Sequence, residues 1–304
     1  MFLGRDKGFC ANSVHTMEIN EEYTLPLNKN DILPKNKLDR GLFVLMTVLI
    51  PALTVWETFI LFQYYPELNF NVFIHFLFGS FLSVNVLGNL YYLKKIDSSA
   101  KQKSLPAVLH ANWKYCHFCQ LNSPPRSYHC PVCDECILKR DQHCMFAGCC
   151  VGFYNHRYYF LAVVYAMLGS LCAALFQLPH CIESIGGFHL LPMLSLAAPH
   201  ISLLFGFVSF YGFICAITQI VLLSAVVLTT YLLIVQIRCI SNGQTIHEKK
   251  ADIRLYDLGL KKNFVQILGM KWFIAIFWPF VSSPIKGDGI QFLTFYDLQE
   301  IKNV

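Results

Sequence analysis

Charged residues are scarce in this sequence: Asp, Glu, Lys and Arg make up 14% of its 304 residues, against about a quarter in a soluble globular chain. With 55% hydrophobic residues, this deficit argues against a soluble protein and for an integral membrane protein. The net charge of +5 is too weak to indicate nucleic-acid binding. The N-terminal region has no apolar run long enough for a signal peptide, and Phe2 stands where N-myristoylation needs glycine. We therefore expect neither a secretory leader nor a myristoyl anchor.

Four apolar segments have the roughly 20 residues that a bilayer-spanning helix needs. They are residues 41–62, 70–93, 158–178 and 211–237. A fifth stretch, 189–210, is marginal because Pro192 and Pro199 break it. We interpret residues 179–210 as a lumenal connection that dips into the bilayer or as an early start of the fourth helix. A sixth, 270–284, is too short to span and reads as interfacial or buried.

Lys and Arg are absent from the stretches 63–69 and 179–210. All 24 of them lie in residues 1–40, 94–157 and 238–304. By the positive-inside rule these three regions face the cytosol. The sequence therefore predicts an all-α multi-pass membrane protein with four or more transmembrane helices. Its expected parts are a disordered cytosolic segment (1–40), helices 1–2 (41–93), a cytosolic cysteine-rich domain (94–157), helices 3–4 with a lumenal connection (158–237) and a cytosolic C-terminal region (238–304).

The loop between the second and third helices holds eleven cysteines and histidines between Cys116 and Cys150. In a reducing compartment such density favours metal–thiolate bonds over disulfides. Three Cys-x2-Cys spacings, with two suitably placed histidines, are typical of zinc sites. The candidate ligands are Cys116, Cys119, His129, Cys130, Cys133, Cys136, His143 and Cys150. They suffice for two Cys3His zinc sites, and spacing alone leaves open whether these are sequential or interleaved. Bound metal would supply the folding energy of a segment without a sizeable core.

Two cysteines of the block remain after this assignment. Cys144 follows Asp141-Gln142-His143, and a position near Lys139 and Arg140 is expected to favour its thiolate. Cys149 reads as a small packed residue.

The run from His129 to Asn155, HCPVCDECILKRDQHCMFAGCCVGFYN, resembles the DHHC family of protein S-acyltransferases, and every cysteine and histidine spacing agrees. Downstream, Thr245 to Glu248 looks like the family's Thr-Thr-x-Glu motif, and the segment around Asn263 looks like its C-terminal element. The tail, from Trp278-Pro279-Phe280 through Gly287-Asp288-Gly289-Ile290, resembles one subgroup of the family, that of the vertebrate member numbered twenty-four. The likeness covers about residues 40–292.

The resemblance implies two interleaved zinc sites, one of Cys116, Cys119, His129 and Cys136, the other of Cys130, Cys133, His143 and Cys150. It implies that Cys144 is the nucleophile, with Asp141 as a catalytic residue, and that Asn155, Thr245, Glu248 and Asn263 are structural motif residues. The co-substrate would be palmitoyl-CoA, whose chain would lie among the helices in contact with membrane lipid. The partners would be proteins with membrane-proximal cysteines, with no nucleic acid, at the endoplasmic reticulum or Golgi. Lys139, Arg140 and Arg157 would contact CoA phosphates or serve as ordinary charges at the cytosolic face.

The sequence departs from the family pattern at the first motif histidine, which is Gln142 here, and an amide is not a proton acceptor in this role. Met145-Phe146 replaces the usual Pro-Trp, and Ile246 replaces the second threonine of the downstream motif. Loss of a general base costs roughly 10²–10⁴-fold in rate, although thiols suffer least. His156 is more readily interpreted as the start of the third helix, but it could compensate for the missing general base. Two hypotheses follow: a protein S-palmitoyltransferase acting through Cys144, with reduced activity, or a catalytically impaired membrane adaptor.

Overall fold

The computed structural model describes residues 33–65, 67, 70–188 and 190–302. The predicted disorder of the N-terminal segment therefore concerns residues that lie mostly outside this range. Where the two overlap, the prediction is wrong, because helix α1 begins at Lys37 instead of residue 41. The Asn36 side chain accepts a hydrogen bond from the Leu38 amide at 2.9 Å and caps this earlier start.

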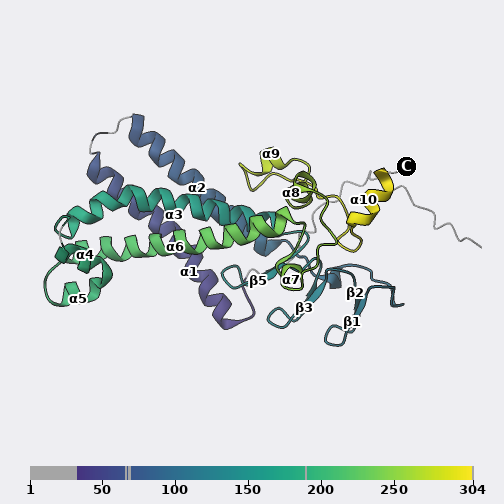
Figure 1. The fold of residues 1–304 in the computed structure, drawn as a ribbon. Helices are drawn as coiled ribbons and strands as arrows, with labels where there is room; N and C mark the ends of the chain where they lie inside the picture. The colour runs from purple at the N-terminus through teal and green to yellow at the C-terminus, as the bar shows by residue number, and fades with distance from the viewer. Residues whose placement is uncertain (1–32, 66, 68–69, 189, 303–304) are drawn as a thin grey trace, which may run out of the picture.

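Four long apolar helices form the body of the molecule (Figure 1). They are α1 (Lys37–Tyr64), α2 (Phe70–Lys95), α3 (His156–Ser184) and α6 (Phe210–Ser241). At 1.5 Å per residue each is roughly 40–48 Å long, which exceeds the ~30 Å hydrocarbon core of a bilayer. Their outer faces carry exposed apolar side chains such as Val48, Val55 and Val227, as lipid contact requires. The chain is a multi-pass integral membrane protein, and the predicted four spans are confirmed.

Two short helices, α4 (Leu190–Ala197) and α5 (Pro199–Leu204), connect α3 to α6. They lie at the opposite end of the bundle from the β-strands (Figure 1). Since they are separate from α6, the alternative of an early start of the fourth helix is wrong. The stretch 270–284 contains only α9 (Trp272–Ala275), which is too short to span.

Three antiparallel β-hairpins occupy the loop between α2 and α3, preceded by a 3₁₀ turn at Ala100–Gln102. They are β1 (Lys114–Cys116) with β2 (Leu121–Ser123), β3 (Tyr128–Cys130) with β4 (Glu135–Ile137), and β5 (Gln142–Cys144) with β6 (Cys149–Val151). Strands of three residues cannot bury a core of their own, so these hairpins depend on other elements for stability. Around the hairpins lie α7 (Ile246–Lys250), α8 (Leu260–Leu268) and α10 (Phe295–Lys302) (Figure 1).

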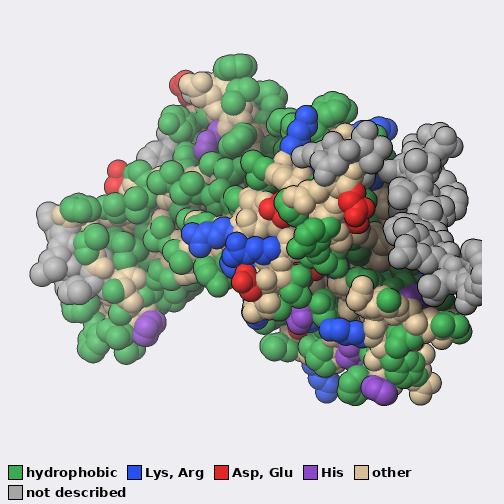
Figure 2. Space-filling model, turned by 45° about the vertical axis from the view of Figure 1, so that its right-hand side comes forward, with side chains coloured by type: hydrophobic (Ala, Val, Ile, Leu, Met, Phe, Trp, Pro, Cys, Tyr) green, Lys and Arg blue, Asp and Glu red, His purple; other side chains and the backbone are tan. Residues whose placement is uncertain are grey.

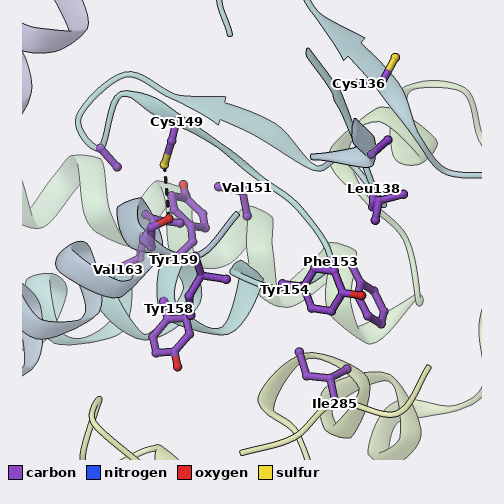
Figure 3. Close-up of a cluster of buried hydrophobic side chains, with 14 residues drawn as sticks. Cys136, Leu138, Cys149, Val151, Phe153, Tyr154, Tyr158, Tyr159, Val163 and Ile285 are labelled. Carbon is purple, nitrogen blue, oxygen red and sulfur yellow. Dashed lines mark hydrogen bonds between the residues drawn. The ribbon is translucent and has the colours of Figure 1, made fainter. Parts of the chain in front are cut away.

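One apolar cluster joins these parts (Figure 3). It contains Leu93 of α2, Leu138 and Val151 of the hairpin region, Tyr159 of α3 and Ile285 of the C-terminal region, all at most 5% exposed. The hairpins are therefore held against the ends of the membrane helices by a shared core. Figure 2 shows the same division on the surface: apolar side chains cover the long helices, and most visible Lys and Arg side chains gather at the hairpin end.

Candidate metal centres and reactive cysteine

Four side chains of the first two hairpins converge on one point. The ligand atoms of Cys116, Cys119, His129 and Cys136 all lie within 4.8 Å of one another. His129 and Cys136 are cross-strand partners, so they point to the same face of their hairpin. The Cys119 sulfur is 3.3 Å from His129 Nδ1, and the ring of Phe118 stacks on the imidazole at 4.9 Å. These contacts leave the nitrogen and the three sulfurs facing a common centre.

A second group consists of Cys130, Cys133, His143 and Cys150, again within 4.8 Å of one another. His143 and Cys150 are cross-strand partners in the third hairpin. The His143 Nδ1 atom lies 3.3 Å from the Cys133 sulfur. The remaining nitrogen, Nε2, donates a hydrogen bond to Asp39 Oδ2 at 2.9 Å.

The two groups are interleaved along the chain because neighbouring residues of a strand point to opposite faces. His129 joins the first group while Cys130, the next residue, joins the second. The two groups are the sets that the resemblance implies. Each offers three thiols and one imidazole, which is the donor set of a closed tetrahedral zinc site.

Cys144 follows His143 in β5 and therefore projects from the other face of the hairpin. Among the described residues, neither metal-binding group includes it. Its partly buried side chain packs against the cluster that contains Tyr159 and Leu93, where the hairpins meet the helices. Burial raises the pKa of the Cys144 thiol, and hydrogen bonds from the backbone of Ala147 and Phe146 partly offset this effect.

The cations expected to activate Cys144 have other surroundings. Lys139 is 5% exposed and lies near Arg126 and Glu248, and burial lowers its pKa to about 7. Arg140 interacts with the sulfurs of the second metal-binding group. The expectation that Lys139 and Arg140 favour the Cys144 thiolate is therefore wrong.

Burial also bears on the predicted contacts to CoA phosphates. Arg157 is only 2% exposed, with bonds to the Tyr158 hydroxyl and the Val281 carbonyl. Buried at this depth, Arg157 and Lys139 are poorly suited to bind the phosphates of a ligand in water.

Asp141 belongs to a buried hydrogen-bond network. Its Oδ1 accepts from the backbone amide of Ile246, and its Oδ2 accepts from Gln236 Nε2, both at 2.8 Å. The Gln236 Oε1 atom in turn accepts from His156 Nε2 at 2.9 Å. Asp141 thus joins the third hairpin to α6, to α7 and to the first residue of α3. These partners give it an anchoring role.

Gln142, in the position of the family's motif histidine, pairs with Val151 across the hairpin. Gln142 and Cys144 both interact electrostatically with Tyr159 of α3, which belongs to the apolar cluster that Cys144 packs against. In place of an imidazole, the surroundings of the thiol therefore contain an amide and a phenol.

The downstream motif forms the start of α7. The Thr245 hydroxyl accepts from the Glu248 amide at 3.2 Å, and the Glu248 carboxylate accepts from the Thr245 amide at 2.8 Å, which makes a capping box. The same carboxylate accepts two hydrogen bonds from Arg126, each at 2.7 Å, and both side chains are buried. This bidentate ion pair ties the C-terminal region to the hairpins.

The two motif asparagines also join segments. Asn155 Nδ2 donates to the carbonyls of Leu93, Ile96 and Cys150, which links α2 to the third hairpin. Asn263 Nδ2 donates to the carbonyl of Ser241 and to Asp257, and this fixes α8 beside the end of α6.

Three residues that complete the site were not among the predicted ones: Asp39, Arg126 and Gln236. Their partners are 104, 122 and 95 positions away in the chain. Asp39 has a local sequence signal, because an acidic residue in the first turn is typical of a helix start. That signal does not indicate a contact with His143.

Comparison with known proteins gives a consistent result. The family model described as DHHC palmitoyltransferase matches residues 109–253. A mouse relative, "Probable palmitoyltransferase ZDHHC24", is 34% identical over 221 residues, which cover 69% of this chain and 75% of the relative. Its human counterpart is 33% identical over 230 residues, covering 72% of this chain and 78% of the relative. The Arabidopsis thaliana "Probable protein S-acyltransferase 12" is 30% identical over 167 residues, or 54% of each chain.

Proposed function

The chain belongs to the DHHC palmitoyltransferase family, and on that premise we propose that it is a protein S-acyltransferase that carries palmitate on Cys144. The acyl donor is palmitoyl-CoA, and the acceptors are cysteines of substrate proteins at the membrane surface. The proposal rests chiefly on one observation. Cys144 belongs to neither candidate metal group, although the adjacent His143 is in one, and its side chain lies against the membrane helices.

The reaction has two thioester exchanges. In the first, the Cys144 sulfur attacks the carbonyl of palmitoyl-CoA, a new carbon–sulfur bond forms, and CoA leaves as its thiolate. In the second, a substrate cysteine attacks the Cys144 thioester, and the Cys144 thiolate leaves. Each step breaks one thioester and makes another, so the sequence needs no other energy source.

The two Cys3His groups are proposed to hold two structural zinc ions, which would stabilise the fold of the hairpins. The protein residues then fix the position of the nucleophile. His143 and Cys150 hold one face of the third hairpin, and Asp141 anchors its start to α6 and α7. Cys144 is thereby oriented toward the helices, where an acyl chain in contact with lipid would end.

The distribution of Lys and Arg supports an orientation with the hairpins, the N-terminal segment and the C-terminal region in the cytosol. CoA would then remain in water while its acyl chain lies among the four helices. Each buried CH₂ group contributes about 0.8 kcal/mol, so burial of the acyl chain supplies much of the free energy of binding of palmitoyl-CoA. We propose the endoplasmic reticulum or Golgi as the location.

The second candidate function, an adaptor without catalysis, is favoured by Gln142 and by the bonds of Asp141. Asp141 accepts hydrogen bonds from Gln236 and from the Ile246 amide in place of a motif imidazole, and burial opposes ionisation of the Cys144 thiol. A slow enzyme and an inactive adaptor therefore differ in one measurable property, the transfer of palmitate from palmitoyl-CoA to Cys144.

The test is incubation of the purified full-length protein in detergent micelles with labelled palmitoyl-CoA. An S-acyltransferase acquires a hydroxylamine-sensitive label, and the Cys144→Ser variant acquires none. Gln142→His should raise the rate of labelling, by at most roughly 10²–10⁴-fold, because it supplies the missing general base. Absence of label in the wild type, with label gained in Gln142→His, would identify a decayed site and favour the adaptor.

A further inference from the structure

The reactive cysteine faces a second thiol across its hairpin. The register of β5 and β6 pairs Cys144 directly with Cys149. Residues opposed in this way in an antiparallel pair have Cα atoms about 4.5–5.5 Å apart, and their side chains leave the same face. This separation lies within the range of about 4.4–6.8 Å that disulfides span.

The metal-binding pair of the same hairpin is on the other face. His143 and Cys150 belong to the second metal-binding group, and alternation along the strands turns Cys144 and Cys149 away from it. Cys149 is therefore outside both groups despite its position next to a ligand. The two thiols of this pair share one apolar cluster, with Cys149 as a buried member and Cys144 packed against it.

A disulfide with Cys144 requires a change of rotamer at Cys149, whose side chain is directed to Leu93 in this structure. Its sulfur donates a hydrogen bond to the Leu93 carbonyl at 3.6 Å (Figure 3). A thiol is a weak hydrogen-bond donor, so the loss of this bond to the Leu93 carbonyl costs little free energy. The hairpin loop between the two cysteines has only four residues, 145–148, which keeps the two strands in register.

We propose that Cys149 is a resolving thiol that forms a reversible disulfide with Cys144 when the protein meets a peroxide. This modification goes beyond the acyl transfer proposed above. The Cys144 thiolate attacks one peroxide oxygen, giving a sulfenic acid and, for hydrogen peroxide, water. The Cys149 thiol then attacks the sulfenic sulfur, the S–S bond forms, and a second water leaves. A dithiol reductant returns both thiols by exchange.

The disulfide has two consequences for the reactive cysteine. While it persists, Cys144 has no thiolate with which to attack palmitoyl-CoA. It also prevents further oxidation of Cys144 to the sulfinic acid, which is irreversible for most proteins.

The experiment uses the full-length, zinc-loaded protein in micelles, with its metal content measured before and after oxidation. The protein is treated with equimolar hydrogen peroxide, and its free thiols are alkylated under denaturing conditions. The tryptic peptide 141–157 is then fragmented in tandem mass spectrometry, so that the position of the alkyl group shows which of its three cysteines is not in the link. We expect this peptide to lose two hydrogen atoms through a Cys144–Cys149 link that dithiothreitol reverses, with the metal content unchanged. In Cys149→Ser, which retains a donor for the Leu93 carbonyl, Cys144 should instead gain oxygen atoms that dithiothreitol does not remove.

Two results would overturn the proposal. One is a link from Cys144 to Cys150 with loss of metal, and the other is oxidation of Cys144 to the sulfinic acid at the same rate in the wild type and in Cys149→Ser. The assignment of the link in the wild type does not depend on how the variant folds. Because the link is assigned from the fragment masses of this peptide, it can be found or refuted whether or not Cys144 accepts palmitate.

Discussion

Asp39 accepts a hydrogen bond from His143 Nε2 at 2.9 Å, although the two residues lie 104 positions apart. Asp39 is in the first turn of α1, and His143 is in β5. Because Nδ1 of the same ring faces the cysteine sulfurs, the bond fixes which nitrogen carries the proton. The start of the first membrane helix therefore orients a candidate metal ligand beside the reactive cysteine.

The first prediction concerns this bond. Asp39→Ala should weaken zinc binding at the second group by about 10–100-fold, as is usual when the outer partner of a ligating histidine is removed. The measurement is competition with a chelator of known affinity. Asp134→Ala is the matched control, since Asp134 lies 3.9 Å from His129 Nε2 and its side chain is 84% exposed. Equal effects of the two changes would contradict the role of Asp39.

Gly148 provides a second prediction, because it lies where the third hairpin touches the chain that enters α1. Its φ is +56°, and a Cβ added there would lie 2.2 Å from Pro34 Cγ. Gly148→Ala should therefore destabilise the protein by about 1–3 kcal/mol and reduce labelling of Cys144. Gly41→Ala is the control, since an added Cβ there has no neighbour within 4 Å and favours the helix. Thermal unfolding in micelles distinguishes the two, and an unchanged midpoint for Gly148→Ala would refute the close contact.

The Arg126–Glu248 ion pair leads to the third prediction. Arg126→Met leaves a buried carboxylate without its partner, and it should cost about 3–5 kcal/mol in the free energy of unfolding. The double variant Arg126→Met with Glu248→Gln should recover part of this loss, because the uncompensated charge is gone. Arg254→Met serves as the control: Arg254 pairs with Asp252 at 3.1 Å on the surface, and its loss should cost at most about 1 kcal/mol. Similar losses for Arg126→Met and Arg254→Met would argue against a burial effect.

The fourth prediction is a pH dependence caused by Lys139. Burial lowers the pKa of this lysine to about 7, whereas an unfolded lysine has a pKa of about 10.4. Between these values the unfolded chain binds the additional proton, so the free energy of unfolding should rise with pH, by at most about 1.4 kcal/mol per unit. The Lys139→Met variant should lack this contribution. Unfolding midpoints of both proteins from about pH 7 to about pH 9 test it, and parallel curves would contradict it.

Several parts of the fold were predictable because their signals are local. Four apolar runs predicted the four membrane helices, and the prolines at 192 and 199 predicted that the segment between α3 and α6 does not form one long helix. The spacing of the cysteines and histidines singled out eight candidate ligands, and the structure brings all eight together. Their division into two sets came from the family resemblance, since the spacing alone was equally compatible with sequential sites.

Other features could not be predicted from the sequence. The start of α1 at Lys37 depends on the Asn36 cap and on contacts with the third hairpin, so the polar composition of the preceding segment was misleading. Lys139 and Arg140 are close to Cys144 in the chain, yet Lys139 is buried near Arg126 and Glu248, and Arg140 interacts with the metal-ligand sulfurs. Proximity in sequence does not determine the direction of a side chain.

The sequence by itself determined that this chain crosses a membrane and contains a compact set of thiols and imidazoles, because both properties follow from residue type and short spacing. Only the tertiary structure decided which residues support that set: Asp39 behind His143, Gln236 beside Asp141, and Arg126 paired with Glu248. It also decided that Cys144 and Cys149 share one face of a hairpin and the metal ligands the other. The physical reason is that these relationships arise from strand register and from packing between distant segments, which local composition does not encode.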